Sequence, residues 1–248
     1  MAQVKAAVTD YIGTLVNAQH YSMAASRRTL HKALVEAGLE TEYEKFLEAY
    51  QRAHEKYRVI RYEQFREVTN AVWVCEALND AGCKTSIEDP RVKSALNVFF
   101  KDYVDSLELR PYAKKLLTKI KAHCKIGLVS NFTYAPVVYA SIRKLGINQF
   151  FDAVVVSEEN GWRKPHTQIF RDTLEKLHVR PEETVFIGDS PLEDIKGARE
   201  VGMKAVFVAS QFYSLKDLQD SGEKPNVIAE DLRQIYNNFE KIIGELSN

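Results

Sequence analysis

The sequence predicts an α/β fold with a parallel β-sheet at its centre and an all-helical domain inserted into it. Two features lead to this prediction. Short apolar runs alternate with helical patterns through the second half of the chain, and a long stretch near its start has helical patterns without a convincing strand. At 248 residues the chain can form one large domain or a core with an insert.

Six short runs rich in Val and Ile have the length of β-strands. They do not alternate between apolar and polar residues, which is typical of strands buried on both faces of a sheet. The six runs are residues 4–8, 126–129, 153–156, 185–187, 205–208 and 227–229.

Helical patterns follow several of these runs. From the second run onward, strand-like and helical patterns alternate, which indicates βαβ units and therefore a parallel sheet. One further helix is expected before the second run, and an amphipathic helix is expected near residue 240. The predicted helices of this half are residues 111–122, 135–145, 168–177, 193–201 and 231–246.

Residues 16–110 are the long stretch without a convincing strand. A connection of this length is too long for a loop in a compact domain, so it predicts a helical module inserted into the α/β core. We therefore expect a core domain built from residues 1–15 and 111–248 and a helical domain of residues 16–110. The helices predicted within it are residues 24–37, 42–57, 62–79 and 91–104.

The overall composition narrows the kind of ligand. Lys and Arg together number 34, as do Asp and Glu, so no global field favours nucleic acid or an anionic membrane. The sequence shows no signal peptide and no run of about 20 apolar residues that could span a membrane. Its three cysteines form no C-x-x-C pair. We expect a cytoplasmic protein without a disulfide framework, in which any charged ligand is recognised by local groups.

Acidic and polar residues follow four of the predicted strands. Ligands bind beyond the carboxyl ends of the strands in an open parallel sheet, so these residues should meet at one edge. Any one of them could simply cap the next helix. Together they predict a site, because carboxylates suit Mg²⁺ and a nearby lysine would keep a nucleophilic carboxylate ionised. The residues are Asp10, Ser130, Asn131, Ser157, Glu158, Glu159, Lys164, Asp189, Ser190 and Asp194.

Four short motifs stand in order along the chain: DYIGTL, LVSN, RKP and GDSPLEDIKGA. In this order, after four strand-like runs, they resemble the four motifs of the haloacid dehalogenase-like (HAD) hydrolases. The resemblance covers the whole core and the position of the helical insert. It implies a Rossmann-like core and an insert that acts as a cap, which closes over the substrate and excludes water.

The resemblance also implies a role for each motif residue. Asp10 would be the nucleophile that forms a covalent intermediate, and Ser130 with Lys164 would bind and orient the anionic group of the substrate. Magnesium would be held by Asp10, by Asp189 and by the backbone carbonyl of Ile12. The remaining candidates are Asp194, which would support the site from the following helix, and the substrate contacts Thr14, Asn131 and Trp162.

Ile12 departs from the family pattern, because most phosphatases of this superfamily have a second aspartate there as general acid and base. A leaving alkoxide needs a proton, and general acid catalysis is worth about 10²- to 10⁴-fold in rate. We favour a magnesium-dependent phosphatase that acts on a small phosphorylated metabolite through an aspartyl-phosphate. Its substrate would be an acyl or aryl phosphate, whose leaving group departs unprotonated, or the proton would come from a group such as His20 or His31.

Three alternatives stay open. A 2-haloacid dehalogenase would expel halide, which needs no proton. These enzymes need no metal, however, and they typically have a tyrosine where this chain has Phe170. They also typically have Ser and Asn where this chain has Asp189 and Pro191. A phosphonoacetaldehyde hydrolase would keep magnesium but needs a cap lysine that the sequence does not single out. A HAD scaffold used only for binding would need no acid, yet would have no evident reason to keep the other motif residues. The substrate and the oligomeric state are left open.

Overall fold

A six-stranded parallel sheet forms the centre of the molecule in the computed structural model, which describes residues 3–246. Its strands are β1 (Ala6–Thr9), β4 (Lys125–Ser130), β5 (Ala153–Val156), β6 (Thr184–Gly188), β7 (Lys204–Val208) and β8 (Val227–Ala229). They lie in the order β5-β4-β1-β6-β7-β8, and each neighbouring pair is parallel. The predicted α/β fold with a parallel sheet is confirmed.

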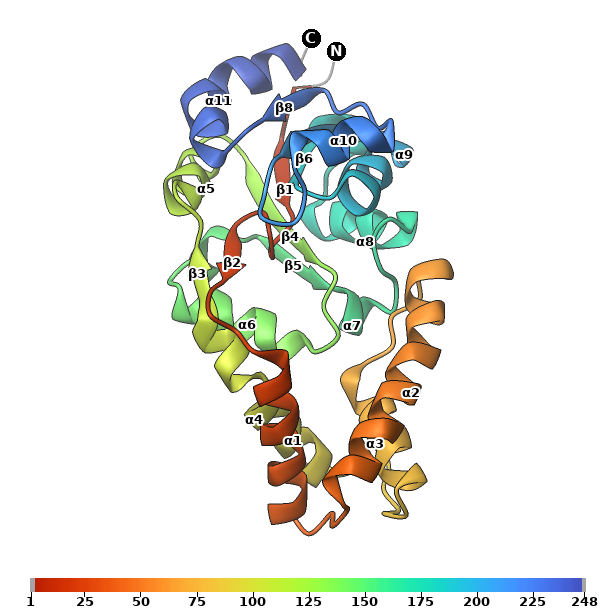
Figure 1. The fold of residues 1–248 in the computed structure, drawn as a ribbon. Helices are drawn as coiled ribbons and strands as arrows, with labels where there is room; N and C mark the ends of the chain where they lie inside the picture. Colours follow the sequence, from red (N-terminus) through yellow and green to blue (C-terminus); the bar gives the residue numbers. More distant parts are fainter. Residues whose placement is uncertain (1–2, 247–248) are drawn as a thin grey trace.

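Helices cover both faces of this sheet (Figure 1). Side chains from one face pack with α5 (Ala113–Lys121), α6 (Ala135–Lys144) and α11 (Leu232–Leu246). Side chains from the other face pack with α8 (Thr167–Leu177), α9 (Gly197–Glu200) and α10 (Leu215–Ser221). Successive residues of a strand point to opposite faces, so an unbroken apolar run is what two apolar layers require.

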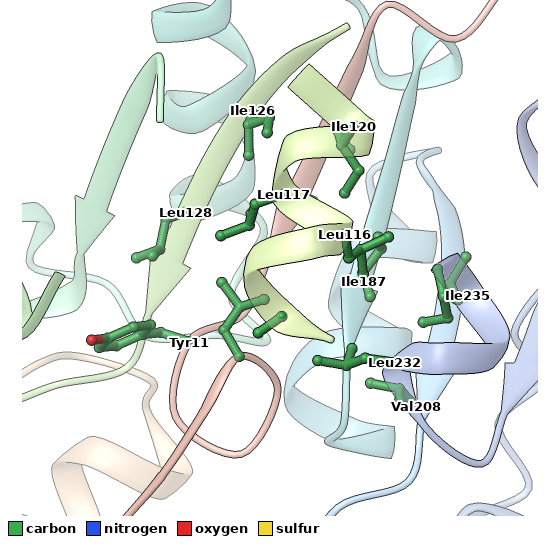
Figure 2. Packing of buried hydrophobic residues seen from close by; sticks show 14 of the residues in the cluster. Tyr11, Leu116, Leu117, Ile120, Ile126, Leu128, Ile187, Val208, Leu232 and Ile235 are labelled. Atoms are coloured by element: carbon green, nitrogen blue, oxygen red, sulfur yellow. The ribbon is translucent and has the colours of Figure 1, made fainter. Parts of the chain in front are cut away.

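The layer under α5 and α11 fixes the end of β1. Figure 2 shows Leu116, Leu117 and Ile120 of α5 packed beside the sheet, with Tyr11 at the edge of the same cluster. The buried Tyr11 hydroxyl donates a hydrogen bond of 2.6 Å to Ser141 Oγ, from α6. Close packing holds the turn after β1 in place.

Residues 16–110, called the helical insert below, contain four helices that lie beyond the carboxyl end of β1 (Figure 1). Their buried side chains form an apolar cluster with Tyr134 and Val137 of the core. Leu30, Phe46, Trp73 and Phe99 each contribute to it from a different helix. In Figure 1, the first helix lies beside the fourth and the second beside the third. The helices are α1 (Met23–Glu36), α2 (Tyr43–Glu63), α3 (Asn70–Asp80) and α4 (Pro90–Ser106).

Two short strands join the helical insert to the core. β2 (Val16–Ala18) and β3 (Leu107–Leu109) pair antiparallel where the chain leaves the core and where it returns. The prediction that this stretch contains no strand is therefore wrong at its two ends. Strands of three residues are too short to show a period, and they form because the two ends of the insert lie side by side.

The segment between α2 and α3 is a second correction. The sequence predicts one helix over residues 62–79, but residues 64–69 are not helical and separate two helices. Phe65 has a positive φ of 53°, which interrupts a helix. Its carbonyl accepts a hydrogen bond of 2.8 Å from the Arg163 N–H, so contact with the core overrides the local helical pattern.

Four short helical turns complete the core: η1 (Asn148–Phe150), α7 (Ser157–Asn160), η2 (Pro181–Glu183) and η3 (Pro191–Lys196). The helix predicted over residues 193–201 begins two residues earlier than expected, as the wide turn η3, and continues as α9. This wide turn carries Asp194, whose position in the site is described below.

All three cysteines, Cys75, Cys83 and Cys124, are free thiols. Across residues 3–246, every helix is too short or too polar to cross a membrane.

Candidate active site

The carboxyl ends of three adjacent strands carry the predicted acids and hydroxyl. Asp10 follows β1, Ser130 ends β4 on one side, and Asp189 follows β6 on the other. Lys164 reaches the same place from the loop between α7 and α8, and its side chain is only 2% exposed. The fold therefore gathers the residues of all four motifs at the edge where ligands bind in such sheets.

Lys164 links two of the acids. Its Nζ donates a hydrogen bond of 2.6 Å to Asp10 Oδ1 and another of 2.6 Å to Asp194 Oδ1. Burial by itself would lower the pKa of Lys164, but the charges of Asp10 and Asp194 outweigh it and raise the pKa above its ordinary value. The lysine is therefore charged at neutral pH and places a cation against the Asp10 carboxylate.

Asp194 holds the turn after β6. Its Oδ2 accepts hydrogen bonds from the backbone N–H groups of Asp189, at 3.1 Å, and Ser190, at 2.9 Å. A Cβ on Gly188 would overlap this carboxylate, so only glycine allows Asp194 to come this close to the strand. Burial raises the pKa of Asp194 strongly, and the charge of Lys164 opposes that rise. Asp194 thus positions both Lys164 and Asp189.

Asp189 is held by two hydroxyl groups. The Thr14 hydroxyl donates to Oδ1 at 3.1 Å, and the Ser210 hydroxyl donates to Oδ2 at 2.6 Å. Burial, with the charge of Asp10 as the second cause, raises the pKa of Asp189 to about 7. Without a bound cation, one of these neighbouring carboxyl groups therefore keeps a proton near neutral pH.

The turn after Asp10 leaves room for the Asp189 carboxylate. Gly13 has a φ of 99°, and a Cβ at this position would overlap Asp189 Oδ2. Arg110 braces the turn from the end of the helical insert, because its guanidinium donates to the carbonyls of Gly13, at 2.5 Å, and Ala209, at 2.6 Å. The loops after β1 and β7 are thus joined beside the site.

The acidic residues fit a divalent cation. Asp10, Asp189 and Asp194 each offer a carboxylate oxygen, and these atoms lie within 4.8 Å of one another. Asp10 Oδ2 is buried and has no hydrogen-bond partner among the described residues, so it has a free acceptor for a cation. Three carboxylates face one lysine, and a hard cation with oxygen ligands, such as Mg²⁺, would balance them.

A family model of haloacid dehalogenase-like hydrolases matches residues 4–202. The chain belongs to this family. The resemblance read from the four motifs is confirmed, and the protein is a hydrolase.

Some curated relatives of this HAD hydrolase extend over most of its length, and others over about half. A glyceraldehyde 3-phosphate phosphatase of Methanocaldococcus jannaschii is 28% identical over 243 residues, which are 96% of this chain and 99% of the relative. One of Methanopyrus kandleri with the same name is 27% identical over 90% of this chain and 91% of its own length. A ribulose-1,5-bisphosphate 5-phosphatase of Halopiger xanaduensis is 32% identical over 47% of this chain and 50% of its own length.

Solved structures share the fold of this HAD hydrolase. A 2-haloacid dehalogenase from Pseudomonas syringae superposes with a TM-score of 0.69 at 20% identity, covering 96% of this chain and 99% of that structure. A HAD phosphatase from Thermococcus onnurineus gives a TM-score of 0.64 at 20% identity, covering 97% of this chain and 98% of the other. At these identities the likeness shows the fold alone.

The three predicted substrate contacts of the HAD hydrolase all have protein partners. Thr14 is fully buried against Asp189, as described. The Asn131 side chain pairs with the backbone of Lys164, accepting from its N–H at 2.8 Å and donating to its carbonyl at 3.0 Å. The Trp162 ring stacks on His166 at 3.6 Å between centroids, and the Arg66 guanidinium lies 4.2 Å from the ring centre. Contact of these side chains with substrate stays a prediction.

Ile12 is half-buried and packs against the apolar layer beneath the sheet. The two histidines considered as substitutes for an acid at this position lie elsewhere in the helical insert. His20 is exposed, and His31 bonds to the Thr41 carbonyl at 2.9 Å while packing on the rings of Tyr43 and Phe46. His31 is therefore held by contacts within the helical insert.

The helical insert contains a buried carboxylate, Glu67, that could not be identified from the sequence. The Glu67 side chain is fully buried and accepts hydrogen bonds from Arg61 Nε at 2.8 Å, from Arg163 Nη1 at 2.6 Å and from the Ser157 hydroxyl. The Glu67 N–H also donates to the Gly161 carbonyl at 3.0 Å. Glu67 thus connects the insert to the loop that carries Lys164.

A cavity of about 220 Å³ lies between the helical insert and the core. Asn131, Phe132 and Thr133 line it from the motif after β4, and the other lining residues come from the insert. Asn131 also holds the backbone of Lys164, so the cavity adjoins the residues that surround Asp10.

Proposed function

We propose that this HAD hydrolase is a magnesium-dependent phosphatase, which acts on a small phosphorylated substrate through an aspartyl-phosphate at Asp10. The observation that carries the proposal is the arrangement of Lys164 between Asp10 and Asp194, beside an Asp189 carboxylate and an unpartnered Asp10 Oδ2. The names of the relatives, which are phosphatases of small phosphorylated compounds, support it.

The residues of the site suit an in-line attack on phosphorus. An Asp10 oxygen forms the new bond to phosphorus while the bond from phosphorus to the ester oxygen breaks, and the leaving group takes that electron pair. Lys164, which is charged and buried, stabilises the negative charge of the transferring group, as would the Ser130 hydroxyl. Water then attacks the aspartyl-phosphate, releasing phosphate and restoring the Asp10 carboxylate.

Asp10 and Asp189 would hold the magnesium ion, with the backbone carbonyl of Ile12 as a third protein ligand. When bound, the ion would neutralise charge on the transferring phosphoryl group. The chain's own groups still control the site: Thr14 and Ser210 orient Asp189, and Lys164 holds one oxygen of Asp10.

The helical insert would act as the cap of this enzyme. Residues 16–110 lie beyond the carboxyl ends of the strands and enclose the cavity beside Asn131. Excluding water from the site strengthens the interactions of Lys164 with its partners. We also expect the enzyme to work in the cytoplasm.

Hydrolysis of acetyl phosphate tests the proposal, because its leaving group, acetate, needs little protonation. We expect turnover that depends on Mg²⁺ and that Asp10→Asn abolishes, with a loss of at least about 10³-fold, since the nucleophile is removed. The matched control is Asp220→Asn, which changes an exposed aspartate on α10. Metal-independent turnover, or full activity in Asp10→Asn, would contradict the proposal.

A chloride-release assay on 2-chloropropionate separates the phosphatase from the dehalogenase. We expect no chloride release, because this site retains the carboxylate cluster of a metal-dependent enzyme. Chloride release without Mg²⁺, together with no action on acetyl phosphate, would replace the proposed function by a dehalogenase.

A further inference from the structure

The walls of the 220 Å³ cavity are mainly aromatic. Tyr103 and Phe132 lie 5.6 Å apart between ring centroids, and Tyr21 packs edge-on against Tyr103 at 4.8 Å. Phe100 continues this wall, and Tyr50 and Trp73 line the cavity from α2 and α3. A cavity of about 150 Å³ already admits benzene, so this one can hold a single ring.

The aromatic wall lies next to the candidate site. Tyr103 and Phe132 pack against the same apolar layer as Ile12, two residues after Asp10. Asn131 lines the same cavity and holds the backbone of Lys164. A molecule whose phosphate lies at Asp10 and Lys164 would therefore place its organic part among these rings.

The lining of the cavity does not repel an anionic ester. No Asp or Glu among the described residues lines it, and the charge of Arg61, which does, is balanced by Glu67 at 2.8 Å. Arg27 lies nearby, 5.8 Å from the centre of the Tyr50 ring. Burial lowers the pKa of His54, and the charges of Arg61 and Arg27 lower it further.

Two buried polar atoms of the cavity have no partner among the described residues. Asn70 Oδ1 could accept one hydrogen bond, and Trp73 Nε1 could donate one. A three- to five-carbon polyol phosphate carries more hydroxyl groups than these two atoms can satisfy, and each one buried without a partner would cost about 1–3 kcal/mol. The Tyr, Phe and Trp side chains that form most of the wall therefore favour a ring over a polyol.

We propose that the substrates of this enzyme are aryl phosphates, in which the phosphate is attached directly to an aromatic ring bound against the wall formed by Tyr21, Tyr103 and Phe132. This inference rests on the proposed phosphatase function and names its substrate class. During transfer, the bond from phosphorus to the phenolic oxygen breaks, the phenolate leaves with the electron pair, and phosphorus becomes bonded to Asp10. The phenolate later takes its proton from water.

The same class accounts for Ile12. A phenol has a pKa of about 10, whereas that of water, the nearest simple model for an alkanol, is about 15.7, so a phenolate leaves far more easily without a proton donor. An acid at position 12 would contribute little to this reaction. Two independent features, the aromatic cavity and the apolar residue beside the nucleophile, therefore indicate the same kind of substrate.

Three substrates and three variants of the full chain test the proposal in the presence of Mg²⁺. Acetyl phosphate has a good leaving group without a ring, phenyl phosphate has the ring, and glyceraldehyde 3-phosphate is a short polyol-type ester. We expect kcat/KM for phenyl phosphate to exceed that for glyceraldehyde 3-phosphate by at least about tenfold, given the apolar area of one ring.

The variant Tyr21→Leu should lower the ratio of kcat/KM for phenyl phosphate to kcat/KM for acetyl phosphate by about three- to tenfold, the value of one aromatic pair. Phe132→Leu should lower it similarly and replaces Tyr21→Leu if that variant does not fold. The control, Tyr236→Leu, removes a half-buried tyrosine that packs on Tyr112 at 5.5 Å, away from the cavity, and should leave the ratio unchanged.

Each other outcome overturns a specific part of the reasoning. Acetyl phosphate turnover with glyceraldehyde 3-phosphate equal to or better than phenyl phosphate would overturn the aryl class while leaving the phosphatase intact. A preference for phenyl phosphate that neither Tyr21→Leu nor Phe132→Leu reduces would show that leaving-group chemistry alone causes it, and would overturn the assigned ring site. No turnover of acetyl phosphate would overturn the proposed function and this inference together.

Discussion

Replacing Lys164 by methionine removes the cation that separates Asp10 from Asp194. Both contacts are 2.6 Å long and the lysine is 2% exposed, so the variant leaves two buried carboxylates without their shared partner. Breaking a buried ion pair in this way costs about 3–5 kcal/mol. In a chain of this size, 1 kcal/mol shifts Tm by about 2–4 °C, so we expect Tm to fall by about 6–20 °C.

The assay is thermal unfolding at about pH 7 with EDTA, so that no cation replaces the lysine. The pKa of Lys164 is raised from 10.5, which means that its stabilisation is fully present below that pH and is lost only as the pH rises through the higher folded-state value. The matched control is Lys32→Met, since Lys32 pairs with Glu36 at 3.7 Å on the surface with 76% of its side chain exposed. An equal loss of Tm in the two variants would refute the argument that Lys164 holds the site together.

Two further predictions concern the cation site. The pKa of Asp189 is raised from 3.8 to about 7, so the folded state binds a proton more tightly than the unfolded state, and Tm without metal should fall as pH rises from about 4 to 7. Mg²⁺ takes the place of that proton, so it should raise Tm more at about pH 8 than at about pH 5. Equal rises in Tm at the two pH values would contradict this reasoning. Gly13→Ala should lower the apparent Mg²⁺ affinity by more than about tenfold, measured both from turnover and from the Mg²⁺-induced rise in Tm, because the new Cβ overlaps Asp189. The control, Gly82→Ala, has a similar φ of 91° but nothing within 4 Å of the new Cβ. It should therefore carry only the backbone strain of about 1–3 kcal/mol and keep its response to Mg²⁺.

The sheet and the acidic residues of the candidate site could be predicted because their signals are local. An unbroken apolar run indicates a strand buried on both faces, and a polar residue directly after it lies at the ligand-binding edge. This rule finds Asp10 and Asp189. It also points toward Ser210, two residues after β7, but a serine in a loop carries no local sign that its hydroxyl donates to Asp189.

The features that the sequence did not reveal depend on contacts between distant segments. β2 and β3 form only because the two ends of the helical insert lie together, and each is too short to show a period. Glu67 stands among other charged residues in a helical pattern, so its burial cannot be foreseen. It follows from Phe65, whose backbone leaves the helix and binds Arg163 instead.

The connection made by Glu67 has a consequence for how often the cap would open. The helical insert meets the core in several places, which include the pairing of β2 with β3, the packing of α4 on α6, where Tyr134 donates to Asn97 at 2.7 Å, and the bonds of Glu67 to Arg163 and Ser157. Separating Glu67 from Arg163 alone would break a buried ion pair, at a cost of about 3–5 kcal/mol. An equilibrium of that size leaves roughly one molecule in 150 to 5,000 open at any moment, so an insert that swings away from Arg163 would stay closed for most of the catalytic cycle.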